Sequence, residues 1–253
     1  QSSLQNQIES FGSHIFKDGS MVIPGAISYD SLYYSVRIKD EHLGIPVSLY
    51  LDQLIGKTLK GQTSGITLKI DSYLLSGTNT EINDLTIFVS YIESGSSNEI
   101  SYLTDGEILI TQESFIYGNT AVNEGETILT LVDDSASAIG SAVGISSGTY
   151  FIRGSFVDVS TDKIVLDPYT NDSSYRVGLD IDEQLVTAKD DNSLYDNARG
   201  FSNYAAPGAD RLKITTTLAK KSLNDYNDTN FIELIRIKDG DIQSLISDPQ
   251  YSL

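Results

Sequence analysis

The sequence predicts a mainly β fold: two small antiparallel sandwich- or barrel-like domains in series, with few short helices. Residue usage favours strands, since the 253 residues include 15 Tyr and 20 Gly but only one Met and no Trp. Several runs alternate apolar and polar residues with a period of two, as half-buried strands do. Turn signals separate these runs at short intervals, which is typical of antiparallel sandwiches and barrels.

The first 60 residues contain the clearest local signals of the N-terminal half. Segment 1–13 is polar and predicts an arm or a short helix. The phrase Lys-Asp-Gly-Ser at 17–20 lies between two apolar runs and predicts a hairpin. Large apolar residues recur at every second position in 31–39, which predicts one strand. Residues 47–61 are ambiguous, and we expect a brief helix or bend at 50–54 followed by a hairpin. No helix longer than about two turns is expected.

Domain boundaries follow from composition. We expect an N-terminal arm at 1–13 and a β-barrel or sandwich domain at 14–140, within which 43–115 could form an inserted subdomain. The segment 136–148 is rich in small residues and is the expected seam. A second β-domain then spans 141–253. Its strands are expected within the runs 149–167, 174–187, 211–221 and 230–246. We expect turns at Arg153-Gly154 and at the phrase Lys-Asp-Gly-Asp, residues 238–241.

Segment 189–210 interrupts this pattern. It has almost no periodicity and is dense in Asp, Asn, Gly and Ala. Connections this long are uncommon inside compact domains unless they are functional. We therefore expect an ordered, extended segment with a specific role.

Composition also excludes several functions. A net charge of −18 repels phosphate backbones and anionic membranes, so neither nucleic-acid binding nor membrane insertion is expected. The absence of Cys excludes disulfides, zinc thiolate sites and cysteine nucleophiles. No apolar run reaches the length of a membrane-spanning helix.

Searches for catalytic chemistry give no catalytic residues. His14 and His42 are far apart in sequence, and no Gly-x-Ser-x-Gly motif is present. Asp180, Asp182 and Glu183 are candidates for the paired carboxylates of a glycosidase. However, Asp180 and Asp182 alternate with apolar residues on a strand and are expected to face solvent. The chain is therefore not expected to be an enzyme.

No cofactor and no metal-ligating residue are assigned. Calcium remains an open alternative at the Asp-rich runs 189–197 and 224–230, although neither has EF-hand spacing. Asp and Asn at this density more often form turns by bonding to their own backbone.

Residues 174–221 carry a family resemblance. The phrases SYRVGLDIDEQLVT and DNSLYDNARGFSNYAAPGADRLKITTTLAKK resemble a domain of unknown function found in virion proteins of large contractile-tailed bacteriophages, especially those of marine cyanobacteria. The phrases YFIRGSFVDV and NFIELIRIKDGDIQ are similar to the same class of tail and baseplate modules. The resemblance is specific over 150–246 and weak before it.

The resemblance implies a structural component of a phage tail, either a baseplate-wedge or a tail-fibre-attachment protein, located in the virion and assembled in the host cytoplasm. Its partners would be other tail or baseplate proteins and copies of itself, and a trimer would suit tail symmetry. The expected interface residues are Asp196, Asn197, Asn203, Tyr204, Pro207, Gly208, Asp210 and Arg211. Pro207-Gly208 is expected to force a turn, and the neighbouring alanines to permit close packing.

Two further expectations concern the extent of the chain and an alternative function. Proteins of this family usually continue further, so we expect a piece of a longer polypeptide, with the second domain cut at its C-terminus. The alternative function is a receptor- or glycan-binding module, or less readily a polysaccharide depolymerase, at the tail periphery. Such a module would use exposed rings such as Tyr33, Tyr91 and Tyr117 for stacking on sugars.

Overall fold

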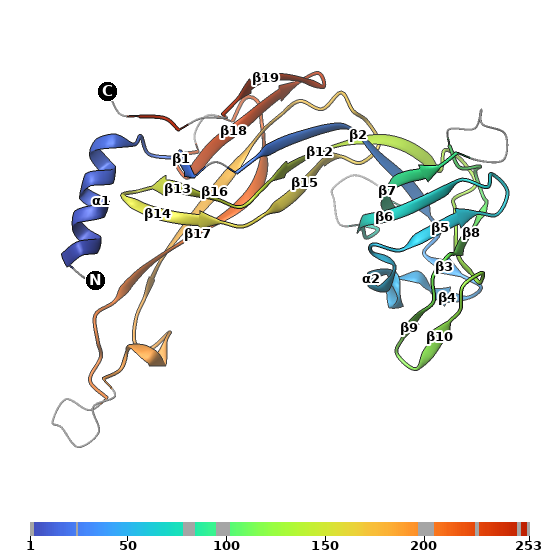
Figure 1. The fold of residues 1–253 in the computed structure, drawn as a ribbon, viewed down its shortest axis with the longest axis horizontal. Helices are drawn as coiled ribbons and strands as arrows, with labels where there is room; N and C mark the ends of the chain where they lie inside the picture. Colours follow the sequence, from blue (N-terminus) through green and yellow to red (C-terminus); the bar gives the residue numbers. More distant parts are fainter. Residues whose placement is uncertain are drawn as a thin grey trace. The chain divides into compact units, whose positions relative to one another are not determined.

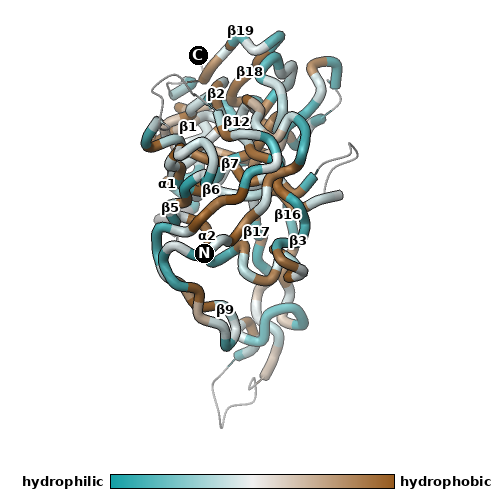
Figure 2. Tube along the Cα trace, turned by 90° about the vertical axis from the view of Figure 1, so that its right-hand side faces the viewer, coloured by the Kyte–Doolittle hydropathy of each residue, from teal (hydrophilic) through white to brown (hydrophobic). Residues whose placement is uncertain are grey.

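The computed structural model is mainly β and antiparallel, which confirms the predicted fold class (Figure 1). It describes residues 3–23, 25–77, 84–94, 102–196, 205–225, 228–246 and 249–251. Hydrophobic and hydrophilic residues are interspersed along the trace (Figure 2). Within the described ranges, no helix has the length and hydropathy of a membrane span.

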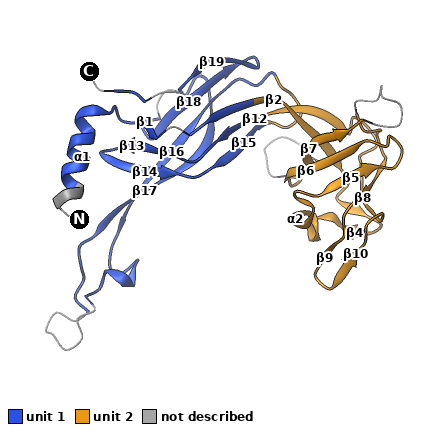
Figure 3. Cartoon of the chain, viewed as in Figure 1, with its two compact units in different colours: residues 1–29, 143–166, 172–253 blue, residues 30–142, 167–171 orange. Residues whose placement is uncertain are grey.

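The chain forms two compact units (Figure 3). Unit 1 comprises residues 1–29, 143–166 and 172–253, and unit 2 comprises residues 30–142 and 167–171. The chain passes between the units within β2 (Ile27–Ile38), within β12 (Ser137–Ile145), at the end of β15 (Asp162–Asp167) and again between residues 171 and 172.

Unit 2 is built on one antiparallel sheet, in which the strand order β11-β8-β5-β6-β7-β2 leads on to β12. Its other elements are β3 (Glu41–His42), β4 (Ile45–Pro46), η1 (Val47–Leu49), α2 (Leu51–Leu54), β5 (Thr58–Gly61), β6 (Thr67–Leu74), β7 (Leu85–Glu93), β8 (Ile108–Thr111), β9 (Phe115–Tyr117), β10 (Thr120–Val122) and β11 (Thr127–Thr130). The predicted short helix followed by a hairpin at 47–61 is confirmed, because α2 precedes the β5–β6 pair. Leu51 and Leu54 of α2 are buried in the same core as the sheet.

Unit 1 contains two antiparallel sheets, β1-β13-β14 and β17-β16-β18-β19. The strands are β1 (Ser20–Ile23), β13 (Gly148–Ile152), β14 (Ser155–Val159), β16 (Tyr175–Val186), β17 (Arg211–Ser222), β18 (Phe231–Lys238) and β19 (Asp241–Leu245). Side chains from both sheets share one core, among them Tyr150, Val177, Leu179 and Ile235. The apolar face predicted for the strand at 174–187 is therefore the core face.

Two predicted turns in unit 1 are confirmed. Arg153-Gly154 joins β13 to β14, and Asp239-Gly240 joins β18 to β19. All four residues have positive φ, which matches the two-residue turn that follows the twist of antiparallel strands.

The N-terminal segment differs from expectation. Helix α1 (Ser3–Ile15) has 13 residues, so the prediction that no helix exceeds two turns is wrong. The predicted hairpin around residues 17–20 is also wrong, since β1 pairs with the distant strand β13. The helix packs against the Phe151 and Phe156 rings, which also contact Phe16. Of the two alternatives expected at 1–13, an arm or a short helix, the helix is therefore present, and these tertiary contacts stabilise it over more turns than expected.

The division into units differs from the expected domains in series. Residues 1–29 lie with the C-terminal segments because β1 pairs with β13 and α1 packs on β13 and β14. Residues 43–115 share the core of unit 2 with β2 and β11 instead of forming a subdomain. The expected seam at 136–148 is largely strand β12, and the unit boundary falls inside that strand.

Tyr150 gives the first testable prediction. Its ring is fully buried in the unit 1 core, and burial raises the pKa of its hydroxyl to about 12. Within the described residues this hydroxyl has no hydrogen-bond partner. Because an unsatisfied buried polar group costs about 1–3 kcal/mol, Tyr150→Phe is expected to stabilise the fold by about 1 kcal/mol. Urea denaturation measures this, and a loss of stability in the variant would contradict the assignment.

Candidate functional site

Strands β16 and β17 form a long hairpin that carries the expected interface segment. Their antiparallel register runs without a break from Tyr175 opposite Ser222 to Val186 opposite Arg211. Strand β18 pairs with β16 only as far as Asp180. Residues 182–186 and 211–215 are therefore a two-stranded ribbon, which we call the outer hairpin. Figure 1 shows it extending away from the other strands of unit 1.

The outer hairpin exposes side chains on both faces. Leu185 and Leu212 are cross-strand partners, and they are 62% and 58% exposed. Two-stranded ribbons are marginally stable by themselves, and an exposed apolar pair adds an unfavourable contact with water. Burial of this pair against another surface would stabilise the ribbon. The outer hairpin therefore presents an apolar pair to solvent.

Charge divides between the two strands of the outer hairpin. Strand β16 contributes Asp182 and Glu183, and strand β17 contributes Arg211 and Lys213, all in exposed or partly exposed positions. Glu183 forms an ion pair with Arg153, at 3.1 Å. No ion pair within 4 Å is recorded for Arg211 or Lys213 in the described part of the chain. The Ser193 hydrogen bonds and the nearby charge of Arg211 lower the pKa of Asp191, so the basic strand is partly balanced by the base of the loop.

The described ends of the loop between β16 and β17 pair with each other. Tyr195 and Pro207 form an antiparallel bridge, and Asp196 exchanges backbone hydrogen bonds with Ala205 and Ala206. The Gly208 N–H donates to the Leu194 carbonyl at 2.8 Å. Backbone hydrogen bonds thus close the described base of the loop.

The predicted interface residues divide into two groups. Asp196, Pro207, Gly208, Asp210 and Arg211 lie along the loop base and the start of β17, whereas Asn197, Asn203 and Tyr204 lie outside the described residues. The turn predicted at Pro207-Gly208 is wrong, because both residues take part in the extended pairing and the left-handed residue is Ala205. Gly208 lies close to the opposite side of the loop base, since a Cβ there would lie 2.5 Å from the Leu194 oxygen. The alanines that were expected to permit close packing are exposed (Ala205 and Ala209) or half-buried (Ala206).

The strand carboxylates are used in ion pairs. Asp180 accepts from Lys221 at 2.8 Å, and Glu183 binds Arg153 instead of facing Asp180 across a cleft. Asp182 is exposed, as predicted for the solvent face. This arrangement differs from the opposed pair that glycoside hydrolysis needs.

The two Asp-rich runs use their carboxylates differently, and the first forms local turns, as its composition indicates. Asp190 accepts hydrogen bonds from the Thr187 N–H and hydroxyl, and Asp191 accepts from the Ser193 N–H. These hydrogen bonds hold the pKa of both carboxyls below their usual value. In the run 224–230, Asp228 instead forms an ion pair with Arg176.

His42 has a structural role. It is buried in unit 2, where its ring nitrogens lie 2.8 Å from the Thr130 hydroxyl and 3.1 Å from the Thr127 hydroxyl. Burial lowers the pKa of its imidazole and so favours the neutral ring. His14 lies at the exposed end of α1.

The three tyrosines considered for sugar stacking pack within unit 2. Tyr33 is buried against the Phe88 ring, and its hydroxyl pairs with Ser72. Tyr117 contacts Tyr50, and Tyr91 contacts Tyr34. The expectation that Tyr33 is exposed is therefore wrong.

A buried charged cluster on the sheet of β16, β17 and β18 was missed by the sequence analysis. Arg176 binds Asp228 at 2.7 Å and Glu233 at 3.2 Å, and its guanidinium lies 5.3 Å from the centroid of the Phe231 ring. Lys221 joins the cluster through Asp228 and the same ring. Alternation along β16 predicts that Arg176 faces away from the core but not that Asp228 covers it. That contact depends on where the β17–β18 connection folds.

Comparison with known families places the hairpin inside a single family domain. The family described as "Domain of unknown function (DUF4815)" matches residues 110–253, more than half of the chain. The chain belongs to the DUF4815 family. The DUF4815 region begins in β8 and includes the whole β16–β17 hairpin and the charged cluster. No curated protein matches the chain. No solved structure matches it either.

Proposed function

We propose that this DUF4815 protein is a structural component of a bacteriophage tail, a baseplate-wedge or tail-fibre-attachment protein that acts through subunit contacts. The observation that carries the proposal is the outer hairpin, which exposes an apolar pair and a basic strand at a distance from the unit 1 core. The resemblance of residues 174–221 to tail proteins of contractile phages supports the same role.

The loop between β16 and β17 would supply the specific contacts. The described base of this loop is held by the Tyr195–Pro207 bridge. A base of fixed geometry loses less conformational entropy on binding than a free segment does. The glycan-binding alternative gains no support from the tyrosines, because the three candidate rings pack within unit 2.

The test removes the loop without disturbing the strands. Val186 and Arg211 are directly paired, so residues 187–210 can be replaced by Asn-Gly, the dipeptide preferred in two-residue hairpin turns. Deleting residues 196–210 provides a second, smaller variant. Both variants are expected to fold but to be absent from phage tails, as measured by mass spectrometry of particles from a phage that encodes the chain.

A matched control changes another two-residue turn. Tyr117 and Thr120 are paired across Gly118-Asn119, so Gly118-Asn119→Asn-Gly alters a turn in unit 2 and leaves the hairpin intact. This control is expected to enter tails normally. Normal incorporation of the loop variants, or absence of the unaltered chain from tails, would overturn the proposed function.

A further inference from the structure

Two tight turns of unit 1 have the same backbone shape but different sequences. Asp239-Gly240 after β18 has φ values of 51° and 79°, and Arg153-Gly154 after β13 has φ values of 49° and 82°. Asp and Asn are preferred at the first of these positions, because their short polar side chains tolerate the left-handed region. Arg153 departs from this preference. A residue that is locally unfavourable is kept where its side chain makes contacts that a better turn residue would lose.

The Arg153 side chain reaches from this turn to the other sheet of unit 1. One guanidinium nitrogen lies 3.1 Å from the Glu183 carboxylate on β16, and another donates to the Asn230 side-chain oxygen at 2.6 Å. The Arg153 N–H donates to the carboxylate of Asp18, which precedes β1. Both side chains of the Arg153–Glu183 pair are 32% exposed, so water and salt screen the pair only partly. Arg153 thus joins three segments that are far apart in sequence.

The ion pair of Arg153 lies at the base of the outer hairpin. Pairing of β16 with β18 ends at Asp180. Glu183 lies further along β16, opposite Ile214 of β17. Alternation along the strand places Glu183 on the same face of the hairpin as the exposed Leu185. The ion pair therefore joins the outer hairpin to the facing sheet, on the face of the hairpin that carries the exposed apolar pair.

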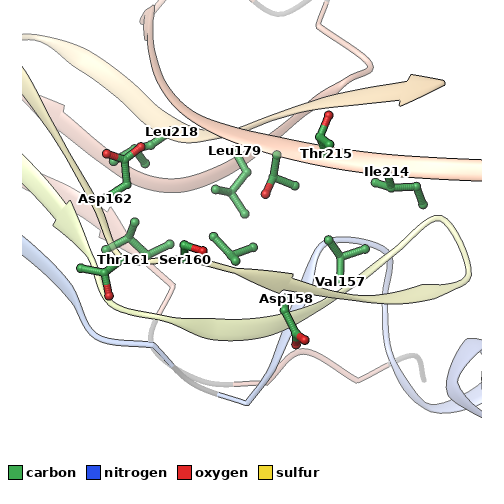
Figure 4. Close-up of a pocket in the computed structure, with 12 residues that line it drawn as sticks. Val157, Asp158, Ser160, Thr161, Asp162, Leu179, Ile214, Thr215 and Leu218 are labelled. Atoms are coloured by element: carbon green, nitrogen blue, oxygen red, sulfur yellow. The ribbon is translucent and has the colours of Figure 1, made fainter. Parts of the chain in front are cut away.

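The other strand of the hairpin is supported less closely. Residues 214–218 of β17 border a hollow of about 280 Å³, and β14 and residues 160–162 line its opposite side. Figure 4 shows Val157 of β14 and Ile214 of β17 at one end of this hollow. A cavity of about 150 Å³ accommodates benzene, so the hollow leaves room for the base of β17 to move toward β14. The direction of the outer hairpin therefore depends on its attachment through β16.

We propose that Arg153 is a latch that holds the outer hairpin in one orientation for assembly. Its contacts with Glu183 and Asn230 fix the angle at which the hairpin leaves unit 1, and so the direction in which Leu185 and Leu212 meet a partner. A preset direction reduces the conformational entropy that a partner contact must overcome. Arg153 acts through the hairpin and is therefore a positioning residue. The proposal rests on the proposed assembly function.

Distances between spin labels test the latch, because the chain has no native cysteine. Labels at Lys213→Cys on the outer hairpin and at Lys238→Cys on β18 report how the hairpin is oriented on unit 1. Arg153→Asn is expected to widen the distance distribution by about twofold or more, since a two-stranded ribbon is only marginally stable by itself. Asn suits this turn, so the thermal unfolding midpoint should shift by no more than about 3 °C. An unchanged distribution would overturn the proposal.

Glu183→Ala removes the other partner of the ion pair and leaves the turn unchanged, so it should also widen the distribution. The matched control is Asp180→Ala, which removes an ion-paired carboxylate from the same strand, at a position where β16 is paired on both sides. The control should keep the narrow distribution. Charge exchange, Arg153→Glu with Glu183→Arg, should narrow the distribution again. Equal widths for the two alanine variants, or no recovery after charge exchange, would contradict the latch.

Tail incorporation separates this proposal from the proposed function. Phage that encode Arg153→Asn should incorporate less of the chain than phage that encode Asp180→Ala, as measured by mass spectrometry of particles. Normal incorporation of a chain whose hairpin distribution is widened would overturn the role of the latch in assembly and leave the proposed function standing. Absence of the unaltered chain from tails would overturn the proposed function, whereas the distance distributions would still decide whether Arg153 holds the hairpin.

Discussion

Replacement of Arg176 by methionine is expected to lower the free energy of unfolding by about 3–5 kcal/mol, the usual cost of leaving buried charges without their partner. The Arg176 side chain is 6% exposed and contacts two carboxylates, of which Asp228 is 13% exposed. It also donates to the Ser222 and Asp225 carbonyls. Removal of the guanidinium therefore leaves several acceptors unsatisfied together, including two negative charges.

The pH dependence distinguishes lost charge pairing from lost packing. Burial raises the pKa of Glu233, but the hydrogen bonds and charges of Arg236 and Arg176 outweigh burial and hold this pKa below its usual 4.5. A lowered pKa in the folded state stabilises the protein above the unfolded-state pKa, and this contribution is lost as pH falls through the folded-state pKa. The difference between wild type and Arg176→Met should thus be largest above pH 4.5 and should shrink in more acidic solution.

Chemical denaturation at a series of pH values measures this difference. Lys238→Met is the control, because Lys238 is exposed at the end of β18 in the same sheet, and it should change stability by less than about 0.5 kcal/mol. An Arg176→Met variant as stable as the Lys238 control would show that the charged cluster does not stabilise unit 1.

Substitution of Gly178 by alanine is expected to destabilise unit 1 by about 3 kcal/mol, at the upper end of the cost of overpacking. A Cβ at this position would lie 1.9 Å from the Ile232 oxygen and 2.8 Å from its carbonyl carbon. Both atoms belong to the backbone of β18, where the register with β16 shifts. The clash can be relieved only by moving two central strands of the sheet apart.

Gly144→Ala provides the matched control for this prediction. A Cβ there would meet the Ser28 hydroxyl at 2.8 Å, and that side chain can rotate away. Thermal unfolding of both variants should therefore show a much larger loss for Gly178. Hydrogen exchange should also show weaker protection of β18 in the Gly178 variant. Equal losses for the two glycines would contradict the close approach of β16 and β18.

The sequence by itself determined those features that depend only on residues close together in the chain, namely the buried face of a strand, tight turns and short-range hydrogen bonds. Alternation along 174–187 predicted the core face of β16, and the phrases Arg-Gly and Lys-Asp-Gly-Asp predicted the turns after β13 and β18. Asp190 and Asp191 bond to nearby backbone groups, which also depends only on neighbours in sequence. The turn expected at Pro207-Gly208 was wrong, because both residues take part in extended pairing with residues 194 and 195.

The tertiary structure decided what depends on contacts between residues far apart in sequence. Helix α1 forms against Phe151 and Phe156, and β1 pairs with β13, so residues 1–29 join unit 1. Asp228 covers Arg176 only because the β17–β18 connection folds over the sheet. The outer hairpin exists because β18 pairs with β16 over half its length, whereas β17 pairs over all of it. Strand registers of this kind are set by packing across the whole sheet. They therefore cannot be predicted from a single run of sequence.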